Sequence, residues 1–278
     1  TGLTAQAKGD NNPKEVVQIL IRGLLIGVLL GFFILLISLP VFRLFFLLSP
    51  AEISVEAYAF EYVKIRVLSA PIAIANITLI GWLIAMERAL RVFFIQLFVN
   101  ILNLSLSILF VLTWDFGVEG VAYATLFSEV CGFFLSLLMC RKVIDFRPNF
   151  TVQGIFDRKK WASLFSINFN IFLRSLLLEM VFLSFLFWGA GFGTLVLAAN
   201  QILIQFLHIF SYALDGFAFS AEVLVGISYG RKNLYDFRRS VLLCTKWAAI
   251  TALFLSLFIF FFVSNIIGFM TTSIEVES

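Results

Sequence analysis

The sequence predicts an all-α fold, a polytopic bundle of transmembrane helices. Of the 278 residues, 61% are hydrophobic and 13% are charged, whereas soluble domains have about 45–50% apolar and about 25% charged residues. Apolar runs of about 20 residues or more recur along the chain, and each is long enough to cross a bilayer as a helix. The basic residues gather in every second connector between these runs. This pattern excludes a cytosolic enzyme, a disordered chain and a disulfide-stapled secreted module.

Seven apolar runs are predicted to span the membrane. The first ends at Pro40, because proline lacks the amide hydrogen that a helix interior needs. The second has Pro71 near its start, and a connector with Arg43 and several glutamates precedes it. Short polar or glycine-containing connectors separate the remaining runs. In order, the predicted spans cover residues 16–39, 67–86, 92–112, 118–140, 161–188, 194–225 and 241–270.

The connectors predict the orientation of these helices, because cytoplasmic loops of membrane proteins are rich in Lys and Arg. Fifteen of the 20 basic residues lie in alternate connectors. The first of these connectors is the start of the chain, so residues 1–15 are predicted to be cytoplasmic. The marker residues are Lys8, Lys14, Arg22, Arg88, Arg91, Arg141, Lys142, Arg147, Arg158, Lys159, Lys160, Arg231, Lys232, Arg238 and Arg239.

An internal repeat predicts a two-lobed architecture. When Gly9 is aligned with Gly230, a shift of 221 residues, each copy shows a span ending in small residues, a short basic loop and a long apolar helix. Both copies begin on the predicted cytoplasmic side, as in transporters built from parallel repeats. The shift implies about six helices per lobe, so the chain is expected to be an excerpt holding helices three to nine. Residues 1–145 would belong to the N-terminal lobe, 146–160 to a cytoplasmic linker and 161–278 to the C-terminal lobe.

Five segments carry a family resemblance: YALDGFAFSAEVLVGISYG at 212–230, NFNIFLRSLLLEMVF at 168–182, IRVLSAPIAIANITLIGW at 65–82, VEGVAYATLFSE at 118–129 and LAANQIL at 197–203. Together they resemble the multidrug and toxic compound extrusion (MATE) transporters, in particular the DinF-like branch. Two features depart from that pattern. Ser107 stands where the branch is expected to have an aspartate, and the helix-one carboxylate thought to serve coupling lies outside this chain.

The resemblance implies a secondary active efflux transporter in the plasma membrane, the inner membrane of a bacterium. It would exchange H⁺ or Na⁺ for organic, cationic or lipophilic compounds by alternating access, with no cofactor beyond the coupling ion. Its expected partners are a small-molecule substrate and membrane lipid. The full-length protein is expected to be monomeric, and the net charge of +3 is too small for nucleic-acid binding. Two alternatives remain open, namely a lipid-linked precursor flippase of the same superfamily and a non-transporting fragment.

Ionisable residues inside the spans are the candidate transport site, because charge in the membrane is costly and usually functional. Along the sixth span, steps of four, three and seven residues place one row of side chains on one helix face. Arg174 in the fifth span is a plausible partner for Asp215, or it extends toward the cytoplasm. The alternative is that these groups only pair helices with one another. The candidates are His208, Tyr212, Asp215, Glu222 and Asn200 in the sixth span, and Arg174 and Glu179 in the fifth.

Further polar residues have weaker assignments. Glu129 and Asn76 are additional pathway candidates, and Asn100 and Asn103 are predicted to join helices by hydrogen bonds. The single histidine and the three separate cysteines do not suggest a metal site. No phosphate-binding, zinc-protease or serine-hydrolase motif is present in the sequence, so an enzyme is not expected.

Overall fold

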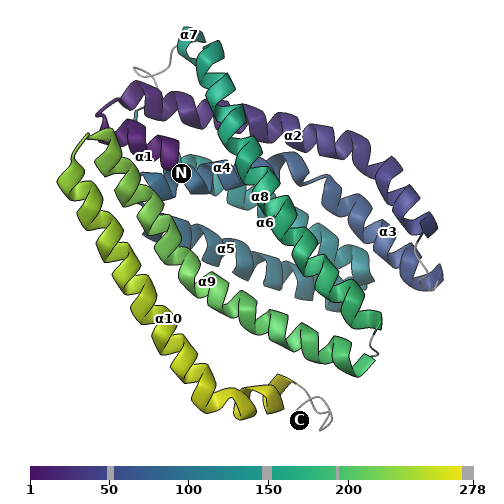
Figure 1. The fold of residues 1–278 in the computed structure, drawn as a ribbon. Helices are drawn as coiled ribbons and strands as arrows, with labels where there is room; N and C mark the ends of the chain where they lie inside the picture. Colours follow the sequence, from purple (N-terminus) through teal and green to yellow (C-terminus); the bar gives the residue numbers. More distant parts are fainter. Residues whose placement is uncertain (49–52, 146–151, 192–193, 271–278) are drawn as a thin grey trace. The chain divides into compact units, whose positions relative to one another are not determined.

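The computed structural model describes residues 1–48, 53–145, 152–191 and 194–270, and every regular element in this part of the chain is helical (Figure 1). The predicted all-α class is therefore confirmed. A π-helical turn, Leu109–Thr113, extends α5. The helices are α1 Gly2–Gly9, α2 Pro13–Leu48, α3 Ile53–Val67, α4 Ala70–Ala85, α5 Ala89–Ile108, α6 Gly117–Arg141, α7 Val152–Ile155, α8 Arg158–Gly191, α9 Thr194–Gly230 and α10 Leu234–Met270.

Six of the described helices are long and apolar enough to cross a membrane, namely α2, α5 with its π-helical turn, α6, α8, α9 and α10. The count becomes seven if the bent pair α3–α4 is one span. The predicted spans from 92–112 onward each lie inside one of these helices. The protein is thus a multi-pass membrane protein, as the composition predicted.

The prediction that Pro40 ends the first span is wrong. Helix α2 continues through this proline to Leu48. A proline interior to a helix loses one backbone hydrogen bond, but transmembrane helices tolerate it because neighbouring groups or small backbone adjustments satisfy the freed carbonyl. An apolar segment in a bilayer also gains nothing by leaving the helix, because lipid offers no other hydrogen-bond partner.

The connector predicted before residue 67 is also corrected. Residues 53–67 form α3, which meets α4 at a 54° bend, so the predicted second span corresponds to a bent pair of helices. The charged residues of α3 lower the mean hydropathy of this segment, so it was not recognised as part of a span. Lys64 pairs with Glu61 at 3.4 Å on the helix surface, and Arg66 pairs with Glu129 of α6. Pro71 lies in the first turn of α4, where no intrahelical amide partner is lost.

The described chain divides into two compact units. Unit 1 comprises residues 1–155 with 229–231, and unit 2 comprises residues 156–228 with 232–278. The predicted lobes and linker are not tested by this division and stay predictions. Residues 146–151 of the predicted linker lie outside the described residues, while 152–155 form the short helix α7.

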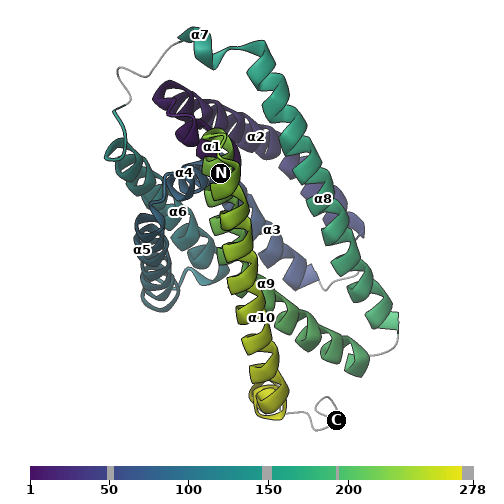
Figure 2. The same ribbon diagram turned by 60° about the vertical axis from the view of Figure 1, so that its left-hand side comes forward.

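Unit 1 is centred on α4, which packs along α2 and against α5 and α6. Both views show α5 beside α6 (Figures 1 and 2). Trp82 of α4 is 2% exposed, and its indole Nε1 donates a 3.0 Å hydrogen bond to the Val16 carbonyl of α2. Leu20, Leu79, Leu83 and other apolar side chains complete the same buried cluster. This cluster fixes the relative positions of the helices that carry the polar groups described below.

Glycines bring α2 and α4 into close contact. A Cβ atom placed on Gly31 would lie 2.2 Å from the Pro71 Cα atom, and one on Gly27 would lie 3.2 Å from the Ala75 Cα atom. Gly23, one turn earlier, lies against the Thr78 side chain. Small residues at four-residue spacing allow two helix backbones to approach each other, which drives packing in membranes where apolar contact alone has little driving force.

Contacts within unit 1 bring three predicted cytoplasmic segments together. Lys8 at the end of α1 forms an ion pair with Glu87 in the α4–α5 turn. Arg91 at the start of α5 donates a 2.9 Å hydrogen bond to the Met139 carbonyl near the end of α6. These segments share one end of the unit, as the alternation of basic residues requires. Which compartment faces that end stays a prediction.

Arg22 needs a correction as a marker of that side. It lies inside α2, is 1% exposed, and its guanidinium donates 2.9 Å to the Glu15 carboxylate and 3.3 Å to the Gln18 side chain. An arginine neutralised by a nearby glutamate can occupy a helix interior, so its charge does not mark a connector.

The turns of the internal repeat have matching geometry at the predicted shift of 221 residues. Asn11 and Lys232 both adopt positive φ angles, 52° and 54°. The Asn12 amide donates 3.0 Å to the Ala7 carbonyl, and the Asn233 amide donates 3.1 Å to the Ser228 carbonyl. Both asparagines then cap the next helix, accepting hydrogen bonds from the backbone amides of Glu15 and Asp236. The repeat is therefore visible in the hydrogen bonds as well as in the sequence.

Unit 2 consists mainly of α8, α9 and α10, whose described apolar side chains are largely exposed. Ser228 near the end of α9 and Ser240 in α10 bring their hydroxyl oxygens within 3.5 Å across the turn that joins the two helices. Exposed leucine and phenylalanine side chains on membrane-spanning helices suit a lipid environment, which is as apolar as they are.

Candidate functional site

The predicted row of polar side chains lies on α9 within the span Leu203–Gly230. His208 is half-buried, with its ring 5.9 Å from Tyr212 in a stacked arrangement and 5.5 Å from Phe182 of α8. Asp215 and Glu222 are exposed further along the helix, and Asn200 is half-buried nearer its start. The structure thus brings His208 and Tyr212 into contact, while Asp215 and Glu222 follow along the helix.

The predicted Arg174–Asp215 ion pair does not form among the described residues. Arg174 and Glu179 are both exposed on α8, and the ion pairs of the described chain do not include Arg174 or Asp215. Sequence spacing predicts which residues share a helix face, but it does not give the rotation of one helix against the next. The role predicted for these residues in transport stays a prediction.

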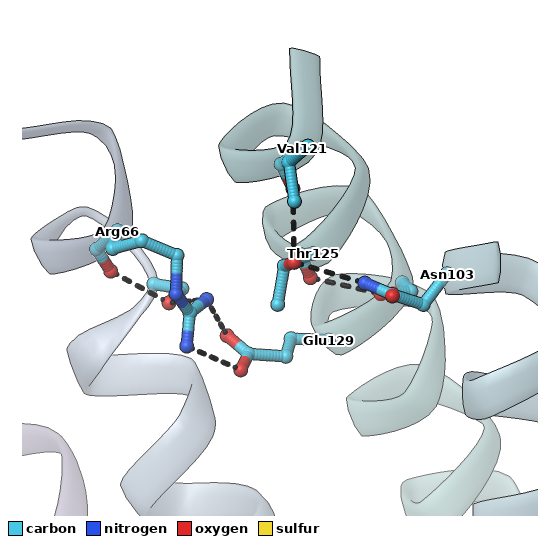
Figure 3. Close-up of polar contacts among 7 residues, drawn as sticks. Arg66, Asn103, Val121, Thr125 and Glu129 are labelled. Atoms are coloured by element: carbon cyan, nitrogen blue, oxygen red, sulfur yellow. Dashed lines mark hydrogen bonds and ion pairs between the residues drawn. The ribbon is translucent and has the colours of Figure 1, made fainter. Parts of the chain in front are cut away.

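A second polar site lies in unit 1 on α6, which packs against both α3 and α5. Arg66 Nη1 and Nη2 donate hydrogen bonds of 3.0 Å each to the two carboxylate oxygens of Glu129 (Figure 3). Arg66 Nη1 also donates 3.1 Å to the Ser69 hydroxyl, whose own hydrogen is donated to the Arg66 carbonyl. The arginine therefore joins the broken helix to α6 with a planar, two-bond contact, the strong geometry for an Arg–carboxylate pair.

Glu129 lies at the middle of its helix, twelve residues after Gly117 and twelve before Arg141. At 1.5 Å per residue the carboxylate is about 18 Å from either helix end. The Arg66 and Glu129 side chains retain 28% and 21% of their accessible area, so neither is fully enclosed. An ion pair at this depth with open surface is the type of feature that marks an ion or substrate pathway.

Asn103 of α5 supports the same part of α6. Its side-chain amide donates 2.9 Å to the Thr125 hydroxyl and 3.3 Å to the Ser128 hydroxyl (Figure 3). The prediction that Asn103 joins helices by hydrogen bonds is confirmed. Asn76 of α4 has a buried side-chain oxygen without a hydrogen-bond partner among the described residues. A Cβ on Gly132, one turn after Glu129, would lie 3.8 Å from the Asn76 amide nitrogen.

The sequence interpretation missed Arg66 because residues 40–66 were taken as a connector. Two signals pointed to it: its position two residues before the Leu-Ser-Ala-Pro segment at the break, and the presence of an acidic residue in the middle of a later span. Their pairing across 63 positions could not be inferred without the tertiary contacts. The described residues contain no group of three or more His, Cys, Asp or Glu side chains suited to a metal ion.

Comparison with known proteins matches the MatE family to residues 1–109 and 171–278. DNA damage-inducible protein F of Escherichia coli (strain K12) is 32% identical over 284 residues, an alignment that covers all of this chain and 61% of that protein. The chain therefore spans less than two thirds of the length of this relative.

Solved structures share the fold. MATE in the straight conformation has a TM-score of 0.86 at 23% identity, covering 99% of this chain and 62% of that one. A MOP superfamily transporter from Pyrococcus furiosus has a TM-score of 0.85 at 23% identity, with the same coverage. An outward-facing multidrug resistance MATE family transporter has a TM-score of 0.83 at 23% identity, covering 98% and 61%. At these identities the likeness concerns the fold alone.

Proposed function

The chain belongs to the MatE family, and from this premise we propose that the protein is a secondary active efflux transporter. Family members are transporters rather than enzymes, in agreement with the sequence prediction that no enzyme is present. The transporter would exchange H⁺ or Na⁺ for an organic, cationic or lipophilic compound. Exchange by alternating access uses a site near the middle of the membrane that opens to one side at a time.

The observation that carries this proposal is the position of the Asp215 carboxylate within a predicted membrane span of this chain. Asp215 lies in the apolar span Leu203–Gly230, close along the helix to the stacked His208 and Tyr212 rings. A carboxylate in a low-dielectric environment resists ionisation unless a cation or a proton compensates its charge. Alternate binding of a coupling ion and an organic cation to such a group produces exchange. Glu222, Glu179 and Asn200 are proposed to line the same pathway.

The membrane location belongs to the same proposal. A bacterial plasma membrane, with residues 1–15 on the cytoplasmic side, is supported by the bacterial source of the 32% identical relative and by the basic connectors. The proposed partners are one small-molecule substrate and the surrounding lipid, and the functional unit is proposed to be a monomer.

Replacing Asp215 with asparagine tests the proposal. We expect Asp215→Asn in the full-length natural protein to reduce proton- or sodium-driven efflux of the cationic dye ethidium from proteoliposomes by at least about tenfold. The amide keeps the shape of the side chain but cannot alternate between charge states. The direct readout is dye fluorescence after an imposed ion gradient.

Asp236→Asn is the matched control. Asp236 lies in the first turn of α10, before the predicted span 241–270, and accepts a 2.8 Å hydrogen bond from Asn233. It should retain transport. Wild-type efflux together with undiminished efflux by Asp215→Asn at equal protein level would remove Asp215 from the mechanism. Absence of efflux by the wild-type protein under both gradients would contradict the proposed function itself.

A further inference from the structure

We propose that Glu129 is a binding site for an organic cation with a planar guanidinium or amidinium group, and that Arg66 is a tethered competitor for this site. The inference rests on the proposed function, because it assumes that the transported compound is an organic cation. In the structure, Arg66 occupies the position that such a ligand would take. The ligand displaces Arg66 from the carboxylate when it binds.

The position of the pair supports a role beyond stability. A paired charge inside a protein contributes little net stability, because the desolvation of both ions offsets their attraction. Glu129 and Arg66 nevertheless lie at the middle of α6 and at the break between α3 and α4. Broken helices near the midplane form the binding sites of many transporters. The pair therefore lies where a transported cation is expected to bind.

The geometry specifies the ligand. Arg66 contacts Glu129 through two parallel hydrogen bonds of 3.0 Å, which requires two N–H groups in one plane. Guanidinium and amidinium groups have this fork, whereas a phosphonium ion has no N–H donor and an ammonium ion acts as a point charge. A ligand that replaces Arg66 without loss of hydrogen bonds must have the same fork.

The surroundings of Glu129 allow a ligand to replace Arg66 at the carboxylate. Because 21% of the Glu129 side chain and 28% of the Arg66 side chain remain exposed, a ligand can approach the pair without unfolding a helix. The Ser69 hydroxyl already accepts a hydrogen bond from Arg66, so a displaced guanidinium keeps a partner. One turn or less before Glu129, the Thr125 and Ser128 hydroxyls accept hydrogen bonds from Asn103, which holds this part of α6 against α5.

Removing the competitor gives the decisive measurement. Calorimetric titration of the purified full-length protein with benzamidine, an amidinium on an apolar ring, is expected to show about tenfold tighter binding to Arg66→Gln than to wild type, or about 1.4 kcal/mol. Tetraphenylphosphonium, which lacks N–H donors, is expected to bind both proteins equally. If Arg66 is only structural, Arg66→Gln gains no affinity for benzamidine, and this result would overturn the inference. An equal gain for both probes would overturn it too, because only net charge would then matter.

The double variant Arg66→Gln with Glu129→Gln covers the case in which the single variant does not fold. It leaves no unpaired charge in the membrane, and Glu129→Gln keeps the shape of that side chain. We expect it to bind benzamidine at least about tenfold more weakly than Arg66→Gln, and more weakly than wild type. Affinity equal to wild type would contradict the site. Lys64→Gln with Glu61→Gln removes the exposed pair on the same helix and is the matched control, with unchanged affinity.

Binding and transport can fail separately. Benzamidine titration needs no ion gradient, so a failed titration with intact ethidium efflux contradicts the inference and leaves the proposed function standing. Tighter binding by Arg66→Gln without any efflux by the wild type supports the site and contradicts the transport activity.

Discussion

Gly31→Ala is expected to lower the stability of the protein by at least about 2 kcal/mol, because overpacking of this kind costs about 1–3 kcal/mol or more. The added Cβ would lie 2.2 Å from the Pro71 Cα atom and 2.9 Å from the Ala70 carbonyl carbon. These are backbone atoms, so no side chain can rotate away. Helices α2 and α4 must move apart, and the expected readout is a lower thermal midpoint of the purified protein in detergent.

Gly216→Ala is the matched control for this prediction. Gly216 lies inside α9, and a Cβ there would meet no atom within 4 Å. Alanine is a better helix former than glycine by about 0.5–1 kcal/mol, so the thermal midpoint should stay or rise. If Gly31→Ala melted like Gly216→Ala, the close approach of α2 and α4 would be wrong. The position of the break beside Arg66 would then need revision as well, since Pro71 follows it directly.

Trp82→Ala is expected to be the most destabilising single change in unit 1, by about 3–5 kcal/mol. The indole is 2% exposed, contacts the buried cluster of α2, α5 and α6, and donates 3.0 Å to the Val16 carbonyl. Truncation leaves a cavity and removes this hydrogen bond. The measurement is the thermal midpoint and the yield of monodisperse protein in detergent.

The control for this cavity is Trp247→Ala. Trp247 lies on α10 and is 54% exposed, so its removal leaves no enclosed space. The difference between the two midpoints therefore measures enclosure rather than the loss of an indole. Equal midpoints would contradict the packing of α4 at the centre of unit 1. Trp82→Phe should recover most of the lost stability, because it restores most of the volume and lacks only the hydrogen bond to α2.

These packing contacts matter for the polar site because they determine where α4 begins. Pro71 is held against Gly31, and the break at residues 68 and 69 precedes it, so Arg66 is presented to α6. Binding groups need rigid support to keep their geometry. Gly31→Ala is therefore expected to weaken the Arg66–Glu129 contact even though it touches neither residue.

The sequence determined much of this protein by itself. Long apolar runs can satisfy their backbone hydrogen bonds in lipid only as helices, so composition and run length were enough to predict an all-α membrane protein. Family-specific segments such as YALDGFAFSAEVLVGISYG predicted the family. The internal repeat predicted two equivalent turns, and the structure shows matching hydrogen bonds in them. Each of these signals lies within one segment of the sequence or comes from comparing two segments with each other.

The tertiary structure decided the contacts between helices. Pro40 remains within α2 because lipid offers no better conformation, and α3 is a helix although its charges give it the composition of a connector. Arg66 pairs with Glu129 across 63 residues, whereas the predicted Arg174–Asp215 pair is not among the ion pairs of the described residues. The physical reason is the same in each case. Periodicity fixes the face of a helix on which a residue lies, but packing at small residues such as Gly31 fixes the rotation and distance between helices, and thereby which charges meet.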